Sequence, residues 1–276
     1  MPVILSGFAD EISPNLGEQL ATLAEESISH LELRSVWSTN VADLDAAAVS
    51  RIRETLRQAG VRVSAIGSPI GKADIGAPFG PELERMRRVA ETAGRLETSL
   101  VRIFSFYLPP GGAPEDYRQQ VIDRMGAFTE IAQEHGITLA HENEKLIYGD
   151  SPQRCADLIA AVGSPVFRAT FDAANFVQCG HRPFTEAYPL LKPYICYVQI
   201  KDARAATGEV VPAGQGDGEM RETLAALTGD GFSSYLSLEP HLRTAGPRGG
   251  DSGPAGFRRA AQALKGLLAE LSVTWS

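Results

Sequence analysis

Side chains with oxygen donors stand where four short apolar segments of the chain end. They are Glu142 in HENE, Asp172 in FDAAN, Gln199 in VQIKD and Glu239 in LEPH. Carboxylate and amide oxygens are the ligands that hard divalent cations prefer. We therefore predict that these four residues bind one divalent cation, Mn²⁺ or Mg²⁺ in preference to Zn²⁺ or Co²⁺.

Such a site needs a scaffold that brings the ends of several strands together. Short apolar segments alternate with longer amphipathic segments along the whole chain, which indicates strands that alternate with helices. The predicted strands span residues 3–8, 30–34, 61–66, 99–104, 137–142, 167–172, 195–201 and 234–239. The predicted helices span about 15–26, 44–59, 81–92, 115–135, 151–161, 184–191, 219–227 and 255–271.

Eight strands in strict alternation with eight helices predict the α/β class, and specifically a single (β/α)8 TIM barrel formed by residues 1–276. An open doubly wound sheet is the alternative, but residues 6–10 lack the glycine-rich phosphate turn that usually follows its first strand. Helix starts are expected at the Ser-Pro pairs 13–14 and 151–152 and at Pro81, and helix ends at Gly60, Gly136 and Gly231. The glycine-rich stretch 246–253 is predicted to be a loop.

The strands also alternate in polarity. In the second strand, Leu31 and Leu33 lie on one face, and Glu32 and Arg34 lie on the other. The apolar face of a barrel strand packs against the helices, so the polar face is expected to point inward. Because buried charges are costly unless they are paired or bound to a metal, this pattern supports a cation at the strand ends, where the active sites of such barrels lie.

The overall composition narrows the class of protein. The 276-residue chain is 43% hydrophobic, has a net charge of −8 and contains three scattered cysteines. An acidic chain does not favour a nucleic-acid partner, and no apolar run approaches the roughly 18 residues of a membrane span. The N-terminus lacks the basic segment of a signal peptide. We expect a cytoplasmic protein that acts on a small molecule, and its state as a monomer or homo-oligomer stays open.

The strings LAHENEK, FDAANF, YVQIKD and LSLEPH resemble the strand-end motifs of the xylose isomerase-like sugar phosphate isomerase/epimerase superfamily of TIM barrels. The resemblance extends to LELRSV and GQGDGE and covers nearly the whole chain. It implies that Glu142, Asp172, Gln199 and Glu239 ligate the metal. Most members have His at the third position, although the hydroxypyruvate-isomerase branch resembles this chain in having Gln. Asn175 stands where many epimerases have a substrate-binding His.

The resemblance implies an isomerase or epimerase of a small carbohydrate substrate: a sugar, a keto-sugar with or without phosphate, or a hydroxy-keto acid. The metal would acidify a C–H bond beside a carbonyl, and Glu142 and Glu239 would act as paired acid and base through an enediolate. One alternative is a dehydratase or lyase that uses the same site, and another is an inactive sugar-binding barrel. Phosphodiester cleavage is disfavoured by the scattered histidines and the acidic charge.

Further polar residues are candidates for substrate binding, each with a structural alternative. Lys201 could instead form a salt bridge with Asp172 or Glu32. Arg34 and Arg102 could simply pair with Glu32. The histidine at 181 could be exposed, and His141 is predicted to be a buried structural residue. The candidate substrate-binding residues are Lys201, Asn175, Arg34, Arg102, His241, His181 and Glu32.

Overall fold

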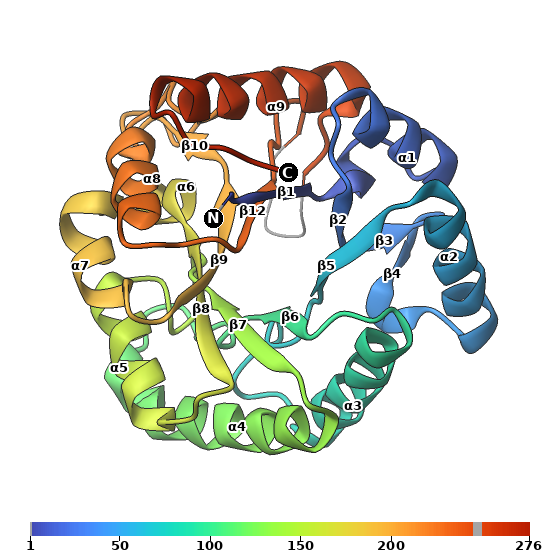
Figure 1. Cartoon of the computed structure of the whole chain (residues 1–276). Helices are drawn as coiled ribbons and strands as arrows, with labels where there is room; N and C mark the ends of the chain where they lie inside the picture. The colour runs from blue at the N-terminus through green and yellow to red at the C-terminus, as the bar shows by residue number, and fades with distance from the viewer. Residues whose placement is uncertain (1, 245–249) are drawn as a thin grey trace.

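The computed structural model describes residues 2–244 and 250–276. Within them, parallel strands form one eight-stranded sheet in the order β1-β12-β9-β8-β7-β6-β5-β2. An isolated parallel bridge between Phe8 and Glu32 brings the two outer strands together, so the sheet is a nearly closed barrel with helices around it (Figure 1). The barrel strands are β1 (Ile4–Gly7), β2 (His30–Leu33), β5 (Arg62–Gly67), β6 (Leu100–Ile103), β7 (Thr138–Glu142), β8 (Phe167–Asp172), β9 (Ile195–Ile200) and β12 (Tyr235–Leu238). The predicted (β/α)8 fold is confirmed.

The helices surround the barrel and confirm the predicted helices, with ends that differ by a few residues. The predicted helix at 184–191 is split into a π-helical turn, Pro183–Ala187, and the short α7. The short α6 was not predicted, because six residues are too few to show a helical period. The helices are α1 (Leu16–Glu25), α2 (Ala46–Ala59), α3 (Gly80–Arg95), α4 (Pro114–His135), α5 (Pro152–Val162), α6 (Ala173–Gln178), α7 (Tyr188–Leu191), α8 (Met220–Gly229) and α9 (Gly253–Glu270).

Local sequence explains several helix boundaries. The Asp45 carboxylate accepts a hydrogen bond from the Ala48 amide at the start of α2, and Ser151 caps α5 in the same way. Gly60 ends α2 in the left-handed conformation, with φ of 68°. At α1 the cap is Asn15 rather than the predicted Ser13-Pro14 pair. Of the predicted loop 246–253, residues 246–249 lie outside the described residues, and Gly253 already begins α9.

The interior of the barrel is polar, as the alternation predicted. Ser64 Oγ lies 2.6 Å from Ser6 Oγ and 2.8 Å from the Tyr197 hydroxyl, and Ser237 Oγ donates to Glu32 Oε2 at 2.7 Å. The opposite faces of the strands pack against the helices through fully buried aliphatic side chains, including Leu31, Leu33, Val101, Ile103, Leu236 and Leu238. Each such side chain contributes about 1.5–3 kcal/mol of hydrophobic stabilisation.

Two short hairpins extend the ends of barrel strands. In the first, β3 (Ser35–Val36) and β4 (Thr39–Asn40) are joined by Trp37 and Ser38, which both have positive φ, as a type I′ turn requires. The second pairs β10 (Asp202–Ala203) with β11 (Val210–Val211). Among the described residues, no helix is both long and apolar enough to span a membrane.

Candidate active site

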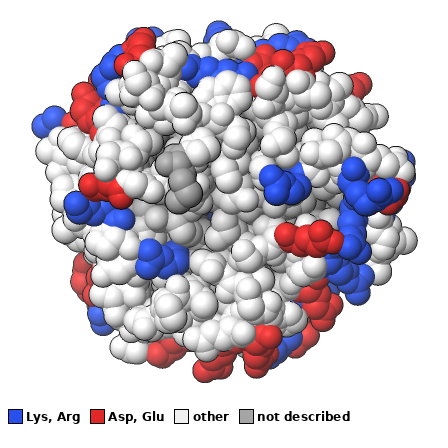
Figure 2. Space-filling view, viewed as in Figure 1, with Lys and Arg blue, Asp and Glu red and all other residues white. Residues whose placement is uncertain are grey.

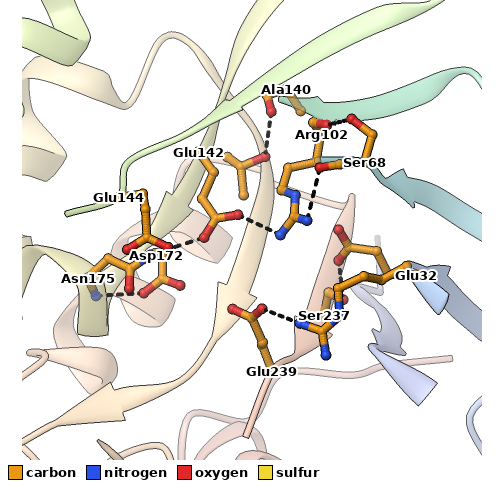
Figure 3. Close-up of polar contacts among 12 residues, drawn as sticks. Glu32, Ser68, Arg102, Ala140, Glu142, Glu144, Asp172, Asn175, Ser237 and Glu239 are labelled. Atoms are coloured by element: carbon orange, nitrogen blue, oxygen red, sulfur yellow. Dashed lines mark hydrogen bonds and ion pairs between the residues drawn. The ribbon is translucent and has the colours of Figure 1, made fainter. Parts of the chain in front are cut away.

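Three carboxylates converge at the C-terminal end of the barrel. Glu142 ends β7, Asp172 ends β8 and Glu239 follows β12. Each is at most 3% exposed, and one oxygen of each lies within 4.8 Å of the others. Figure 3 shows the three side chains entering the same region from their separate strands. Their separation allows one metal ion to bind all three.

Gln199 lies beside this cluster on β9. Its Cα is in register with Asp172 on one side and Ser237 on the other, so its side chain shares their inward face. The residue is fully buried, and neither its amide oxygen nor its amide nitrogen has a hydrogen-bond partner among the described residues. A buried polar group without a partner costs about 1–3 kcal/mol. The residues present therefore fit a cation, which would take Gln199 Oε1 as a neutral ligand.

The Lys201 ammonium bridges two of the carboxylates. Its Nζ lies 2.9 Å from Asp172 Oδ2 and 2.8 Å from Glu239 Oε2. Burial acts to lower the pKa of Lys201, but the neighbouring carboxylates outweigh burial and hold it well above its usual range. The predicted salt bridge with Asp172 is present, and its second partner is Glu239 rather than Glu32.

Two buried arginines hold the other oxygens of the glutamates. Arg102 Nη1 donates to Glu142 Oε2 at 2.9 Å, and Arg34 Nη1 donates to Glu239 Oε1 at 3.1 Å. Both guanidinium groups lie against the Phe8 ring, with Arg34 at 4.5 Å and Arg102 at 5.1 Å from its centroid. The arginines make these contacts instead of the expected direct pairing with Glu32. Burial raises the pKa of Glu32 to about 7.

Asn175 connects two members of the cluster. Its side-chain nitrogen donates to Glu142 Oε1 at 3.0 Å and to the Asn143 carbonyl at 2.9 Å. Its backbone N–H donates to Asp172 Oδ1 at 2.8 Å, because Asp172 caps α6. The structure therefore places Asn175 in contact with the predicted metal ligands, where it fixes the orientation of both carboxylates.

His241 also reaches the cluster, through a partner that the sequence analysis missed. Its Nε2 lies 3.5 Å from Glu239 Oε1 and 3.2 Å from Glu11 Oε1. Glu11 is fully buried, and it accepts hydrogen bonds from the His241 backbone and from Ser252 Oγ, both at 2.8 Å. Glu11 and Asp10 follow β1 closely, so the rule that selected the other strand-end residues could have found them.

The remaining predicted residues lie in other surroundings. His181 is 3.1 Å from Glu186 and packs edge-on against Phe176, so it is not brought together with the carboxylates. His141 is buried and lies 3.0 Å from Ser105 Oγ, in accord with its predicted structural role.

Among the described residues, this end of the barrel contains more buried carboxyl groups than buried basic groups. Five carboxylates that are at most 3% exposed stand against three cations that are at most 8% exposed. Burial raises the pKa of Glu11 and Glu142 to about 8 and that of Asp172 to about 6. For Glu239, burial is outweighed by Lys201, His241 and Arg34, and its pKa lies well below the usual range. A divalent cation bound beside these carboxyl groups would favour their ionised forms. The groups compared are Glu11, Glu32, Glu142, Asp172 and Glu239 against Arg34, Arg102 and Lys201.

The space above these groups is small. A cavity of about 50 Å³ is lined by the two arginines, Lys201, Glu142, Glu239 and His241, with Lys72 and Glu144 at 3.2 Å from each other beside them. This volume holds one or two water molecules, at about 30 Å³ each.

Comparison with known proteins places the chain in a family. A model of the family described as xylose isomerase-like TIM barrel matches residues 21–267. The chain belongs to this family. Among proteins with a described activity, 2-epi-5-epi-valiolone 7-phosphate 2-epimerase from Actinoplanes sp. is 30% identical over 191 residues. That match spans 65% of this chain and 64% of the relative.

Solved structures of xylose isomerase-like proteins share the fold over almost the full chain. A D-tagatose 3-epimerase-like protein aligns with a TM-score of 0.77 and 17% identity, over 99% of this chain and 98% of the other. A xylose isomerase-like TIM barrel protein from Mycobacterium smegmatis in complex with magnesium aligns with a TM-score of 0.70 and 17% identity, over 98% and 97%. At these identities the likeness concerns the fold alone.

Proposed function

We propose that this protein is a divalent-metal-dependent epimerase or isomerase of a small sugar, keto-sugar or hydroxy-keto acid. The observation that carries the proposal is the convergence of Glu142, Asp172 and Glu239 beside Gln199, whose buried amide has no partner among the described residues. The name of the Actinoplanes relative, 2-epi-5-epi-valiolone 7-phosphate 2-epimerase, supports the same class of reaction. The cation is Mg²⁺ or Mn²⁺, because the proposed ligand set contains only oxygen.

The reaction removes one carbon-bound proton from the substrate and puts another in its place. A divalent cation held by the four ligands would supply Lewis acidity toward a carbonyl and its neighbouring hydroxyl. Glu239, which Lys201 and Arg34 hold ionised, accepts the proton from the C–H bond, and the electron pair enters an enediolate. Glu142, protonated at the start of this step, then gives its own proton to carbon, either to the opposite face of the same carbon in epimerisation or to the neighbouring carbon in isomerisation. In isomerisation the hydroxyl proton also moves to the former carbonyl oxygen. Glu239 then releases its proton to solvent and Glu142 regains one before the next turnover.

The surrounding basic side chains assist the reaction by electrostatic interaction, without forming or breaking covalent bonds. Arg102 and Arg34 each contact one catalytic glutamate, which fixes its orientation. Together with Lys201 they offset the negative charge that develops on the enediolate in a site from which water is largely excluded. If the product is unsaturated, the same residues catalyse an elimination, and the protein is a dehydratase or lyase.

Replacing either glutamate tests this proposal. We expect protein purified without chelator to contain about one equivalent of Mg²⁺ or Mn²⁺, and Glu142→Gln and Glu239→Gln to lose most of it while remaining folded. Both variants should also lose exchange of substrate C–H for deuterium in D₂O, measured by NMR over a panel of keto-sugars and sugar phosphates. The checks on metal are elemental analysis and thermal melting with added cation.

Glu144→Gln is the matched control, because Glu144 lies two residues beyond Glu142 but pairs with Lys72 at the mouth of the site. This variant should keep its metal. Full metal content and full exchange in both Glu142→Gln and Glu239→Gln would show that the proposed site is wrong.

A further inference from the structure

A second, larger cavity lies at the opposite end of the barrel. Its volume is about 500 Å³, and it is bounded by α2 and by the first residues of β2, β5 and β12. Tyr235 lines the cavity, whereas Glu239 belongs to the carboxylate cluster. These residues are four positions apart along one strand, which corresponds to about 13 Å at ~3.3 Å per residue. The cavity is therefore separate from the candidate active site.

The floor of this cavity contains a buried polar ring. His30 is 3% exposed, and its ring packs edge-on against Tyr235 with centroids 5.3 Å apart. Its Nδ1 lies 3.1 Å from Ser29 Oγ, which leaves Nε2 as the ring nitrogen available to a ligand. Burial lowers the pKa of His30 to about 4, so the ring is neutral at pH 7.

The rim of the cavity contains three arginines. Arg62 is exposed, lies in register with His30 on the neighbouring strand, and forms no ion pair with any described residue. Arg53 pairs with Glu97 and Arg57 with Glu54, but all four of these side chains are at least half exposed. Exposed pairs of this kind contribute at most about 1 kcal/mol, so an anion can compete for both arginines. Figure 2 shows basic and acidic side chains side by side over α2, at the right of the molecule.

We propose that this cavity binds a small organic anion, with a phosphate or carboxylate group attached to a compact ring. Arg62 contacts the anionic group, His30 Nε2 supplies a second polar contact, and the ring lies against the apolar walls formed by Leu56, Val61, Val63 and Leu96. The volume falls within the range of about 300–1,000 Å³ that is typical of small-molecule sites. This site is independent of the proposed function at the other end of the barrel.

Histidine NMR can test the proposal directly, because the chain has only five histidines. Phenyl phosphate is titrated while the imidazole Cε1–H signals are followed, with the His30 signal assigned from His30→Gln. We expect a saturable shift of the His30 signal. Binding should be weaker for inorganic phosphate, which lacks the ring, and for benzyl alcohol, which lacks the anionic group. The His241 signal reports binding at the active-site end. The absence of a saturable His30 shift, or a shift of His241 alone, would overturn the proposal.

Two arginine variants complete the test. Arg62→Ala should weaken the binding of phenyl phosphate severalfold or more, because it removes the rim cation that no described acidic group already holds. Arg87→Ala is the matched control, since Arg87 is a half-exposed arginine of α3 that pairs with Glu134 away from the cavity, and it should bind as the unaltered protein does. Equal affinity in Arg62→Ala and the unaltered protein would rule out the proposed site.

Discussion

At the scale of single residues, Gln199 is the least satisfied group in the candidate site. It is fully buried in the barrel interior, and both polar atoms of its amide lack a hydrogen-bond partner within the described part of the chain. The neighbouring carboxylates, by contrast, are held by Lys201 and by two arginines. Without metal, the unpaired amide of Gln199 is expected to lower the stability of the protein. With metal bound, the same amide is expected to raise the stability, because it completes the proposed ligand set.

Replacing Gln199 by Leu tests that expectation. In chelator-treated protein, Gln199→Leu should raise the free energy of unfolding by about 1–3 kcal/mol, because an unpaired buried amide is removed. In the presence of Mn²⁺ the variant should show little of the stabilisation that the unaltered protein gains. Chemical denaturation with and without Mn²⁺ measures both effects. A variant that still gains the full stabilisation would show that Gln199 is not a ligand.

At the scale of elements, Asp202 organises the GQGDGE loop, residues 214–219, which follows β11. Its carboxylate accepts four backbone hydrogen bonds, from Ala203, Gly214, Gly216 and Gly218, at 2.8–3.0 Å. A Cβ at Gly216 would lie only 2.5 Å from the Ala203 carbonyl oxygen, so the loop also requires glycine there. Because Asp202 directly follows Lys201, this loop holds the end of the strand that carries the proposed site.

Asp202→Asn should therefore destabilise the protein by about 1–3 kcal/mol, since the amide NH₂ would face backbone N–H donors that then lack an acceptor. Urea denaturation measures the change. Asp217→Asn is the control from the same loop, because Asp217 is exposed and accepts a backbone hydrogen bond from Ala205. Equal stability of the two variants would contradict the organising role of Asp202.

At the scale of the whole molecule, buried histidines make the stability sensitive to acid. Burial, together with the nearby Arg62, lowers the pKa of His30 from 6.5 to about 4. Between these values the unfolded chain binds a proton that the folded chain does not. The stability that neutral His30 contributes is therefore complete above pH 6.5 and is lost as the pH falls toward 4.

His30→Gln should reduce this loss. Between about pH 6.5 and 4.5, the unfolding free energy of the variant should fall less steeply than that of the unaltered protein, by at most about 1.4 kcal/mol per pH unit. Denaturation series at several pH values provide the measurement, and His135→Gln, at the exposed end of α4, is the control. Parallel curves for the unaltered protein and His30→Gln would contradict the prediction.

Local patterns in the sequence are sufficient to predict the barrel and the set of strand-end oxygen donors. Both depend on local regularities: the two-residue alternation of a strand, the longer period of a helix, and the meeting of parallel strand ends at one end of a barrel. These rules need no knowledge of distant contacts, so Glu142, Asp172 and Glu239 could be placed together in advance. The roles of these residues in catalysis stay predictions.

The pairing of these groups, by contrast, depends on contacts between distant parts of the chain. Arg34 contacts Glu239, 205 positions away, and Glu11 contacts the backbone of His241, 230 positions away. Such pairings depend on strand register and side-chain conformation across the closed barrel, which no local pattern contains. The same reason explains why His181, in a loop beyond α6, pairs with Glu186 instead of the carboxylates, and why the cavity at the other end could not be foreseen.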